Sequence, residues 1–259
     1  MAGPLSMPRT GERPTVPRSP WPTPLNTVAS PRALVVCLPF GGGSASAYRP
    51  WAARFPANVQ LCAVDLPGHA ARFAEPLLTH AEQIVAELLG LPDLPVPFVL
   101  FGHSVGALLA YEWASRLQQA GRPAPTHLVV SGRAAPQTMR SPAPIHGLDN
   151  ADFLSEVHRY QGLPDEVLAH QELIDLFLPI LRADFTITET YSHAPRPALR
   201  TPLLILGGEQ DPMVAPAELS HWRALTTAPS RIETFPGGHF YLDRHRDALV
   251  DRLVSLLPR

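Results

Sequence analysis

The chain has 259 residues, of which 45% are hydrophobic and 17% are charged, and its formal net charge is −2 at pH 7. This length and composition are sufficient for one domain with a substantial core. A charge so close to zero gives no sign of the basic surface that a nucleic-acid partner would need. The two cysteines form no disulfide framework, which indicates a reducing compartment, so we expect a cytoplasmic protein.

Residues 1–31 differ in composition from the rest of the chain, because they are rich in proline, arginine, serine and threonine. Such a segment buries too little apolar surface to offset the entropy lost on ordering, and it lacks the apolar core of a signal peptide. We therefore expect a flexible tail over 1–31 and one folded domain over 32–259. No apolar run reaches about 18 residues, so we expect no membrane partner. We also expect a monomer.

After the tail, short apolar runs alternate with longer helix-like stretches. The expected strands are Ala33–Leu38, Gln60–Asp65, Phe98–Phe101, His127–Ser131, Pro202–Leu206 and Arg231–Phe235. The expected helices between them are Tyr48–Phe55, His80–Leu89, Ser104–Ala120, Ala215–Ala224 and Arg244–Leu257. Continuous Val, Leu and Ile runs are typical of strands that are buried on both faces. The alternation predicts an α/β fold, with a mostly parallel central sheet flanked by helices.

The interval between residues 132 and 201 interrupts this alternation, because it contains no strand pattern. Helix-like patterns cover Asp149–Gln161 and Gln171–Tyr191 instead. Long loops without secondary structure are uncommon in compact domains. We therefore expect a helical insertion at about 136–200, which would act as a lid.

The segment Gly102-His-Ser-Val-Gly106 carries the strongest chemical signal in the sequence. A predicted strand leads into it and an alanine-rich helix follows at once. This strand–turn–helix setting is that of the G-x-S-x-G nucleophile elbow of α/β-hydrolases, with Ser104 as the nucleophile. The glycines would let neighbouring backbone approach the turn, and the helix dipole would favour negative charge near the hydroxyl.

A serine hydroxyl needs a base, and in this fold the triad follows the order Ser, acid, His. His239 comes after the last expected strand and two glycines, on a loop that can return over the sheet. We predict His239 as the base. His221 and His245 fall in helical patterns, and we expect them to be solvated. His103 adjoins the nucleophile but would point elsewhere, so a packing or supporting role is expected for it.

The acid should follow a strand that lies between the serine and the histidine. Asp211 stands in the turn after the strand at 202–206, whereas the earlier strand end at Val129–Arg133 carries no carboxylate. We predict Asp211 as the acid, with Glu209 as its nearest rival and Asp184 as a distant one. His239, Asp243 and His245 also cluster in sequence, but their spacing does not match a metalloenzyme motif. We expect no metal and no other cofactor.

The glycine-rich loop Leu38-Pro-Phe-Gly-Gly-Gly-Ser-Ala45 follows the first expected strand. It lacks both the spacing of a dinucleotide-binding loop and the following Lys-Ser/Thr of a phosphate-binding loop. In a hydrolase this loop and the residue after the nucleophile supply the two backbone N–H groups of an oxyanion hole. We predict Phe40 and Val105 as these donors, and Gly41 remains an alternative to Phe40.

These motifs together resemble the type II thioesterases that accompany polyketide and nonribosomal peptide synthetases. Two segments look like loops of that family: the glycine-rich loop Leu38–Ser46 and the segment Val64-Asp-Leu-Pro-Gly-His69. The most discriminating match is Leu178-Pro-Ile-Leu-Arg-Ala-Asp-Phe185, with Glu189-Thr-Tyr191, in the expected lid. The resemblance spans about residues 33–257. The family often has a His-Ala pair where Phe40-Gly41 stands here.

The resemblance implies a free-standing editing enzyme that hydrolyses acyl groups from phosphopantetheine thioesters on acyl or peptidyl carrier proteins. The position of Asp211 after the later strand agrees with this subgroup. A broad carboxylesterase or lipase is the rival enzyme interpretation, since the elbow alone is shared with such enzymes. A catalytically inactive binding module is the alternative from a different class.

Overall fold

The computed structural model describes residues 22–138, 144–160, 163 and 165–258. Its seven strands form one sheet in the order β1-β3-β2-β4-β5-β6-β7, in which β1 is antiparallel to its neighbour and the other pairings are parallel. The strands are β1 (Thr23–Pro24), β2 (Ala33–Leu38), β3 (Val59–Ala63), β4 (Phe98–His103), β5 (His127–Ser131), β6 (Leu203–Gly208) and β7 (Ser230–Phe235). The predicted mostly parallel α/β fold is confirmed.

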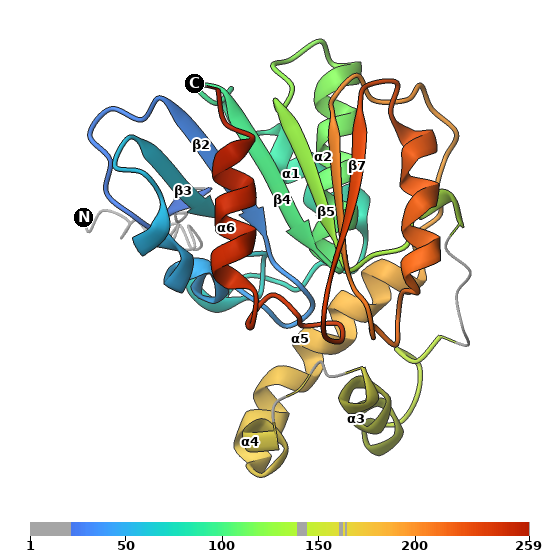
Figure 1. Cartoon of the computed structure of the whole chain (residues 1–259). Helices are drawn as coiled ribbons and strands as arrows, with labels where there is room; N and C mark the ends of the chain where they lie inside the picture. The colour runs from blue at the N-terminus through green and yellow to red at the C-terminus, as the bar shows by residue number, and fades with distance from the viewer. Residues whose placement is uncertain (1–21, 139–143, 161–162, 164, 259) are drawn as a thin grey trace, which may run out of the picture.

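Helices cover both faces of this sheet (Figure 1). One face packs against α1 (Ala81–Leu89), α2 (Val105–Gln119) and η4 (Pro216–Leu225). The other face packs against η1 (Ala45–Arg54) and α6 (Arg246–Ser255). Strands covered in this way need apolar side chains on both sides, which explains why β2, β3, β4 and β6 are buried at every position.

All six strands expected from the sequence are present, with ends displaced by at most two residues. The most useful displacement is in β4, which continues to His103 and therefore delivers the chain directly to Ser104. The stretch expected as a helix at Tyr48–Phe55 forms the 3-10 helix η1 instead. Pro50 lies inside η1, and a proline removes a backbone N–H that an α-helix needs.

The N-terminal segment contacts the sheet from Thr23 onward, so the expectation of a flexible tail is corrected for residues 23–26. β1 pairs with β3, and the N–H of Leu25 donates to the carbonyl of Leu61 at 2.9 Å. The side chain of Asn26 accepts from the Leu61 N–H at 2.8 Å. Proline is tolerated here because β1 is an edge strand. Residues 1–21 of the predicted tail lie outside the described residues.

The interval between β5 and β6 contains helices, as expected. They are η3 (Pro136–Thr138), α3 (Asn150–Arg159), α4 (Asp165–Leu168) and α5 (Gln171–Glu189). Figure 1 shows α3, α4 and α5 grouped at one end of the sheet. They share a small apolar core of their own, which includes Phe153, Val157 and Leu181. The role of this helical insertion as a lid stays a prediction.

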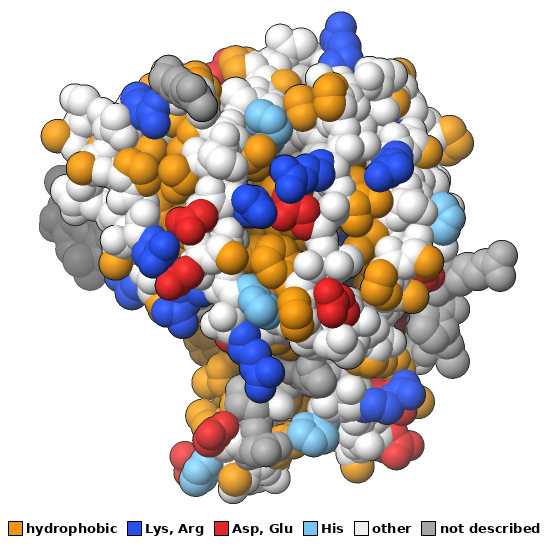
Figure 2. All heavy atoms as spheres, in the orientation of Figure 1, with side chains coloured by type: hydrophobic (Ala, Val, Ile, Leu, Met, Phe, Trp, Pro, Cys, Tyr) orange, Lys and Arg blue, Asp and Glu red, His pale blue; other side chains and the backbone are white. Residues whose placement is uncertain are grey.

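Charged side chains of both signs lie on the surface of the described residues. On the face shown in Figure 2, basic and acidic side chains are interspersed rather than gathered by sign. Within the described residues, no helix combines the length and apolar character needed to cross a bilayer.

Candidate active site

Ser104 occupies a strained turn between β4 and α2. Its backbone has φ 55° and ψ −120°, and it is the residue that precedes the first turn of α2. Left-handed φ values are uncommon for residues other than glycine and concentrate at functional positions. The side chain is partly exposed, and it stands where the unpaired N–H groups of a helix begin.

The two glycines of the turn are required by close backbone crossings. A Cβ on Gly102 would lie 2.1 Å from the carbonyl oxygen of Gly106. A Cβ on Gly106 would lie 2.4 Å from the carbonyl oxygens of both Leu38 and Pro39. The turn is therefore pressed against the loop that follows β2, which confirms the interpretation of both glycines.

Asp211 and His239 form a buried hydrogen-bonded pair. The imidazole Nδ1 of His239 lies 2.8 Å from Oδ2 of Asp211. His239 is 2% exposed and Asp211 is 8% exposed. The other carboxylate oxygen accepts from the N–H groups of Met213 at 2.8 Å and Val214 at 3.3 Å. An ionised carboxylate accepts only, so Nδ1 carries the hydrogen and Nε2 is the basic nitrogen. The carboxylate therefore fixes both the orientation and the tautomer of His239.

The loops that carry this pair are held together by their backbones. The N–H of Glu209 donates to the carbonyl of Phe235, and that of Gln210 donates to the carbonyl of Gly237, both at 2.9 Å. A Cβ on Gly208 would lie 2.3 Å from the carbonyl oxygen of Gly238. Glu209, the rival acid, has an exposed side chain. The structure thus brings Asp211, and not Glu209, to His239.

The predicted oxyanion loop after β2 has an ordered hydrogen-bond pattern. The N–H of Gly43 donates to the carbonyl of Phe40 at 2.8 Å, and the N–H of Gly42 donates to Oδ2 of Asp184 at 2.7 Å. Gly42 is thereby excluded as an oxyanion donor. No described residue accepts from the N–H of Phe40 or Gly41, and Val105 N–H is at the unpaired start of α2. Phe40 and Val105 stay predictions, with Gly41 as the alternative to Phe40.

Comparison with known proteins agrees with this arrangement. The sequence model of the family described as "Thioesterase domain" matches residues 33–257. The chain belongs to the thioesterase family. Its enzymatic chemistry is therefore the hydrolysis of thioesters, on the α/β-hydrolase fold described above.

Several proteins are similar to this thioesterase over most of its length. A "probable cadicidin biosynthesis thioesterase" from Streptomyces griseus is 39% identical over 86% of the chain, which spans 62% of that relative. The "gramicidin S biosynthesis protein GrsT" of Aneurinibacillus migulanus is 34% identical, over 92% of the chain and 93% of the relative. The solved type II thioesterase BorB, from the borrelidin biosynthetic cluster, is 36% identical with a TM-score of 0.83, over 93% of this chain and 99% of that one.

His103 is buried beneath the site of the thioesterase and supports it from inside. Its Nδ1 lies 2.8 Å from the hydroxyl of Ser131, which in turn lies 2.6 Å from the hydroxyl of Tyr241. Burial, together with the nearby His239, holds the pKa of His103 well below its usual range. A neutral His103 fits the supporting role expected from the sequence.

The family-like motif in the thioesterase's insertion consists of residues that tie α5 to other segments. Glu189 accepts from the N–H groups of Ile145 and His146, both at 3.0 Å. Arg182 donates to the carbonyl of Leu148 at 2.8 Å, and the hydroxyl of Tyr191 donates to Glu112 on α2. In the sequence this motif is visible only as a family resemblance, whereas the structure gives its residues their contacts.

Asp184 and His69 were missed as members of the site. Asp184, considered above only as a distant alternative acid, contacts Gly42 and His69 rather than His239. His69 lay in a segment noted for its resemblance, and no role was assigned to it. The sequence signal for the pair was that each residue lies in a family-like motif. Neither residue had an assigned partner there.

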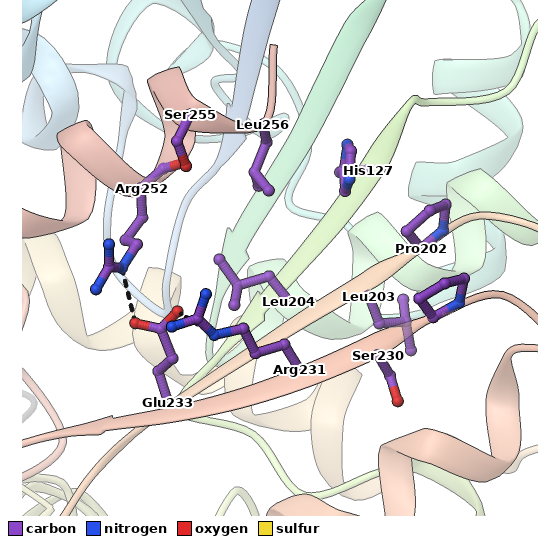
Figure 3. A pocket seen from close by; sticks show the side chains of 11 residues that line it. His127, Pro202, Leu203, Leu204, Ser230, Arg231, Glu233, Arg252, Ser255 and Leu256 are labelled. Atoms are coloured by element: carbon purple, nitrogen blue, oxygen red, sulfur yellow. Dashed lines mark hydrogen bonds and ion pairs between the residues drawn. The ribbon is translucent and has the colours of Figure 1, made fainter. Parts of the chain in front are cut away.

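The other candidate positions lie away from this chemistry. His245 is half-buried rather than solvated as expected, and its Nε2 lies 2.8 Å from the carbonyl oxygen of Pro236. Within the described residues, no group of three or more His, Cys, Asp or Glu side chains is arranged to hold a metal ion. A cavity of about 200 Å³ is lined by Leu203, Ser230, Arg231 and neighbours (Figure 3), and Arg252 and Arg231 both pair there with Glu233. It opens at the amino ends of β6 and β7, whereas Ser104, Asp211 and His239 follow carboxyl ends of strands.

Proposed function

We propose that this thioesterase removes acyl groups from the phosphopantetheine thioesters of acyl or peptidyl carrier proteins, with Ser104, His239 and Asp211 as its catalytic triad. The observation that carries the proposal is the buried Asp211–His239 pair at the end of the sheet where Ser104 holds its strained turn. The names of its relatives, which refer to gramicidin S and borrelidin biosynthesis, support a carrier-bound substrate. An editing role, the clearing of stalled or misprimed carriers, fits a separate enzyme of this kind.

The first half of the reaction transfers the acyl group to the enzyme. Oγ of Ser104 attacks the thioester carbonyl carbon while Nε2 of His239 takes the hydroxyl proton. The carbonyl electron pair moves to oxygen, and the N–H groups of Phe40 (or Gly41) and Val105 stabilise that oxyanion. When the carbon–sulfur bond breaks, the proton on His239 passes to the sulfur and the pantetheine thiol leaves.

The second half regenerates the enzyme. His239 takes a proton from water as the water oxygen attacks the acyl-serine, and the same backbone donors hold the second oxyanion. Collapse breaks the ester bond, returns the proton to Oγ of Ser104 and releases the carboxylic acid. His239 is 4.9 Å from His103 between ring centroids, and a neutral His103 imposes no repulsion on the imidazolium that forms in each half.

The helical insertion is proposed to act as a lid whose inner side receives the acyl chain. Leu181 of α5 supports this, because a Cβ on Gly42 would lie 2.8 Å from it. Phe177 and Phe185 belong to the apolar core shared by α3 and α5. With Leu173, they complete the proposed acyl channel. Leu176 of the same helix is 41% exposed and is not part of the proposed channel.

Compartment and assembly remain part of the proposal. Both cysteines are buried and unpaired, which fits a reducing compartment such as the cytoplasm. The protein is proposed to work as a monomer, since one chain carries all three members of the triad.

The test is hydrolysis of a panel of acyl groups loaded on carrier proteins, by the native enzyme and by Ser104→Ala. Loss of the nucleophile should reduce kcat by up to about 10⁶-fold, as in other triad enzymes, while leaving the fold intact. A fluorophosphonate probe should label the native enzyme and not the variant. More than a tenth of native activity in Ser104→Ala would remove the triad assignment. A native enzyme that cleaves oxygen esters but not thioesters would be a carboxylesterase, and one that neither turns over nor takes the label would be a binding module.

A further inference from the structure

A second buried Asp–His pair lies beside the oxyanion loop, separate from the proposed triad. Asp184 on α5 is 1% exposed and His69, after β3, is 3% exposed. Oδ2 of Asp184 accepts from the N–H of Gly42 at 2.7 Å and lies 3.0 Å from Nε2 of His69. Oδ1 of Asp184 is also buried, and no described residue donates to it. The mechanism described above makes no use of this pair.

The contacts of His69 determine where its protons lie. Nδ1 is 3.0 Å from the carbonyl oxygen of Pro67, which only accepts, so Nδ1 carries a hydrogen. Nε2 faces the carboxylate of Asp184, which accepts from it when the ring is protonated to an imidazolium. Burial alone would lower the pKa of His69, but the hydrogen bond and charge of Asp184 outweigh it and raise the pKa. The imidazolium thereby neutralises a carboxylate that would be costly to bury alone.

The oxyanion loop is held by two carboxylates from different parts of the chain. Oδ1 of Asp65, after β3, accepts from the N–H of Ala45 at 2.7 Å. Asp184, from the insertion, accepts from Gly42, whose φ of +72° is part of the turn closed between Phe40 and Gly43. The Asp65 contact comes from the α/β core, whereas the Asp184 contact exists only while α5 is docked. Phe40 and Gly41, whose N–H groups are the candidate oxyanion donors, immediately precede Gly42 in the sequence, and Asp184 holds the N–H of Gly42.

We propose that Asp184 is a positioning residue for the oxyanion hole, with His69 as its charge partner. Through the Gly42 N–H, the carboxylate sets the loop so that its free N–H groups face the developing oxyanion. Transition-state stabilisation therefore depends on the docking of α5. This inference rests on the proposed function, because it assumes that Ser104 forms a tetrahedral intermediate next to this loop.

The first test is steady-state hydrolysis by Asp184→Ala. Removing an oxyanion donor altogether costs about 10²–10³-fold in kcat, so a displaced donor should cost about 10–100-fold with KM changed by less than about twofold. Asp184→Asn keeps the volume and one acceptor oxygen for Gly42 but loses the charge that pairs with His69, so its loss should be smaller but measurable. If Asp184→Ala does not fold, Asp184→Asn tests the positioning role of Asp184 in its place. Asp175→Ala, an exposed carboxylate on the same helix, should leave kcat unchanged.

The second test separates positioning from a general loosening of the insertion. A trifluoromethyl ketone analogue forms an adduct in which Ser104 Oγ bonds to the ketone carbon. The ketone oxygen takes the negative charge, and the serine proton moves to His239. Its Ki for Asp184→Ala should rise by the same factor by which kcat/KM falls, while an unreactive amide analogue binds as before. Glu189→Gln weakens contacts with Ile145 and His146, which lie within the insertion and do not reach the oxyanion loop, so it should not raise this Ki.

The third test is a double-mutant cycle between the two partners. Because His69 acts through Asp184, the losses in kcat for His69→Gln and Asp184→Asn should be far from additive. Additive losses, an equal weakening of both inhibitors, or native kcat in a folded Asp184→Asn would each overturn the proposal. These outcomes differ from the one that would overturn the proposed function. That outcome is a Ser104→Ala variant that remains active.

Discussion

His239 and His103 have ring centroids 4.9 Å apart, yet their partners give them different properties. A carboxylate holds Nδ1 of His239, whereas Nδ1 of His103 contacts the hydroxyl of Ser131. Burial and the neighbouring imidazole depress the pKa of His103. These two neighbouring side chains therefore have separate tasks, since of the two only His239 has a partner that stabilises an imidazolium.

At the residue scale, the roles of the two candidate acids are separable by isosteric replacement. Asp211→Asn should keep the fold but lower kcat by about 10⁴-fold, as in serine proteases, because an amide favours the wrong tautomer of His239. Glu209→Gln should change kcat by less than about tenfold, since its side chain is exposed. Steady-state kinetics on one acyl-carrier substrate measures both. The reverse ranking would assign the acid to Glu209.

At the scale of elements, the site is made by close contacts between loops that follow parallel strands. The loop after β2 touches the turn after β4, and the loop after β6 touches the loop after β7. The insertion adds α5, whose Asp184 and Glu189 accept backbone N–H groups from two further segments. These contacts require glycine where two backbones approach closely, and carboxylates where backbone N–H groups have no other acceptor.

The elbow should therefore tolerate no side chain at its first glycine. Gly102→Ala places a Cβ 2.1 Å from the Gly106 carbonyl oxygen, so we expect a loss of about 3 kcal/mol or more in the free energy of unfolding. Gly147→Ala is a matched control, because nothing lies within 4 Å of its Cβ, and it should change stability by less than about 0.5 kcal/mol. Urea denaturation gives both values. Equal midpoints for the two variants would contradict the close packing of the elbow.

At the scale of the whole molecule, chemistry and insertion share one end of the sheet (Figure 1). Ser104 follows β4, Asp211 follows β6 and His239 follows β7, while α3, α4 and α5 gather at that same end. In the proposed lid role of these helices, a substrate reaches Ser104 by passing between them and the loops. Binding energy gained far from the thioester can then orient the carbonyl, as expected for a carrier that delivers it on a long arm.

The carrier should therefore raise catalytic efficiency beyond that of the bare thioester. For one acyl group, such as propionyl, we expect kcat/KM to be highest on an acyl carrier protein and lower on coenzyme A and on N-acetylcysteamine. Among short acyl chains we expect modest preferences, because each methylene contributes only about 1–3 kcal/mol. Equal kcat/KM on all three carriers would contradict carrier recognition while leaving the serine hydrolase chemistry intact.

The sequence by itself determined the parts of this protein that are local. Apolar runs predicted six strands, and β2, β3, β4 and β6 are buried at every position, because strands covered on both faces have no polar side to display. The glycines around Ser104 predicted the elbow, since a turn so tight excludes Cβ atoms at fixed positions. Chain order and turn chemistry were enough to choose Asp211 and His239, which the fold brings to 2.8 Å.

Only the tertiary structure decided the contacts between distant segments. β1 was missed because two residues of an edge strand leave no periodic pattern, and their pairing with β3 depends on a neighbour 38 to 40 positions away. The link of Asp184 to Gly42 and His69 joins three segments that are up to 142 residues apart. An acidic residue in an amphipathic helix has no sequence feature that distinguishes a solvated side chain from a buried one. Packing of α5 against the loops supplies that distinction, and with it the second Asp–His pair.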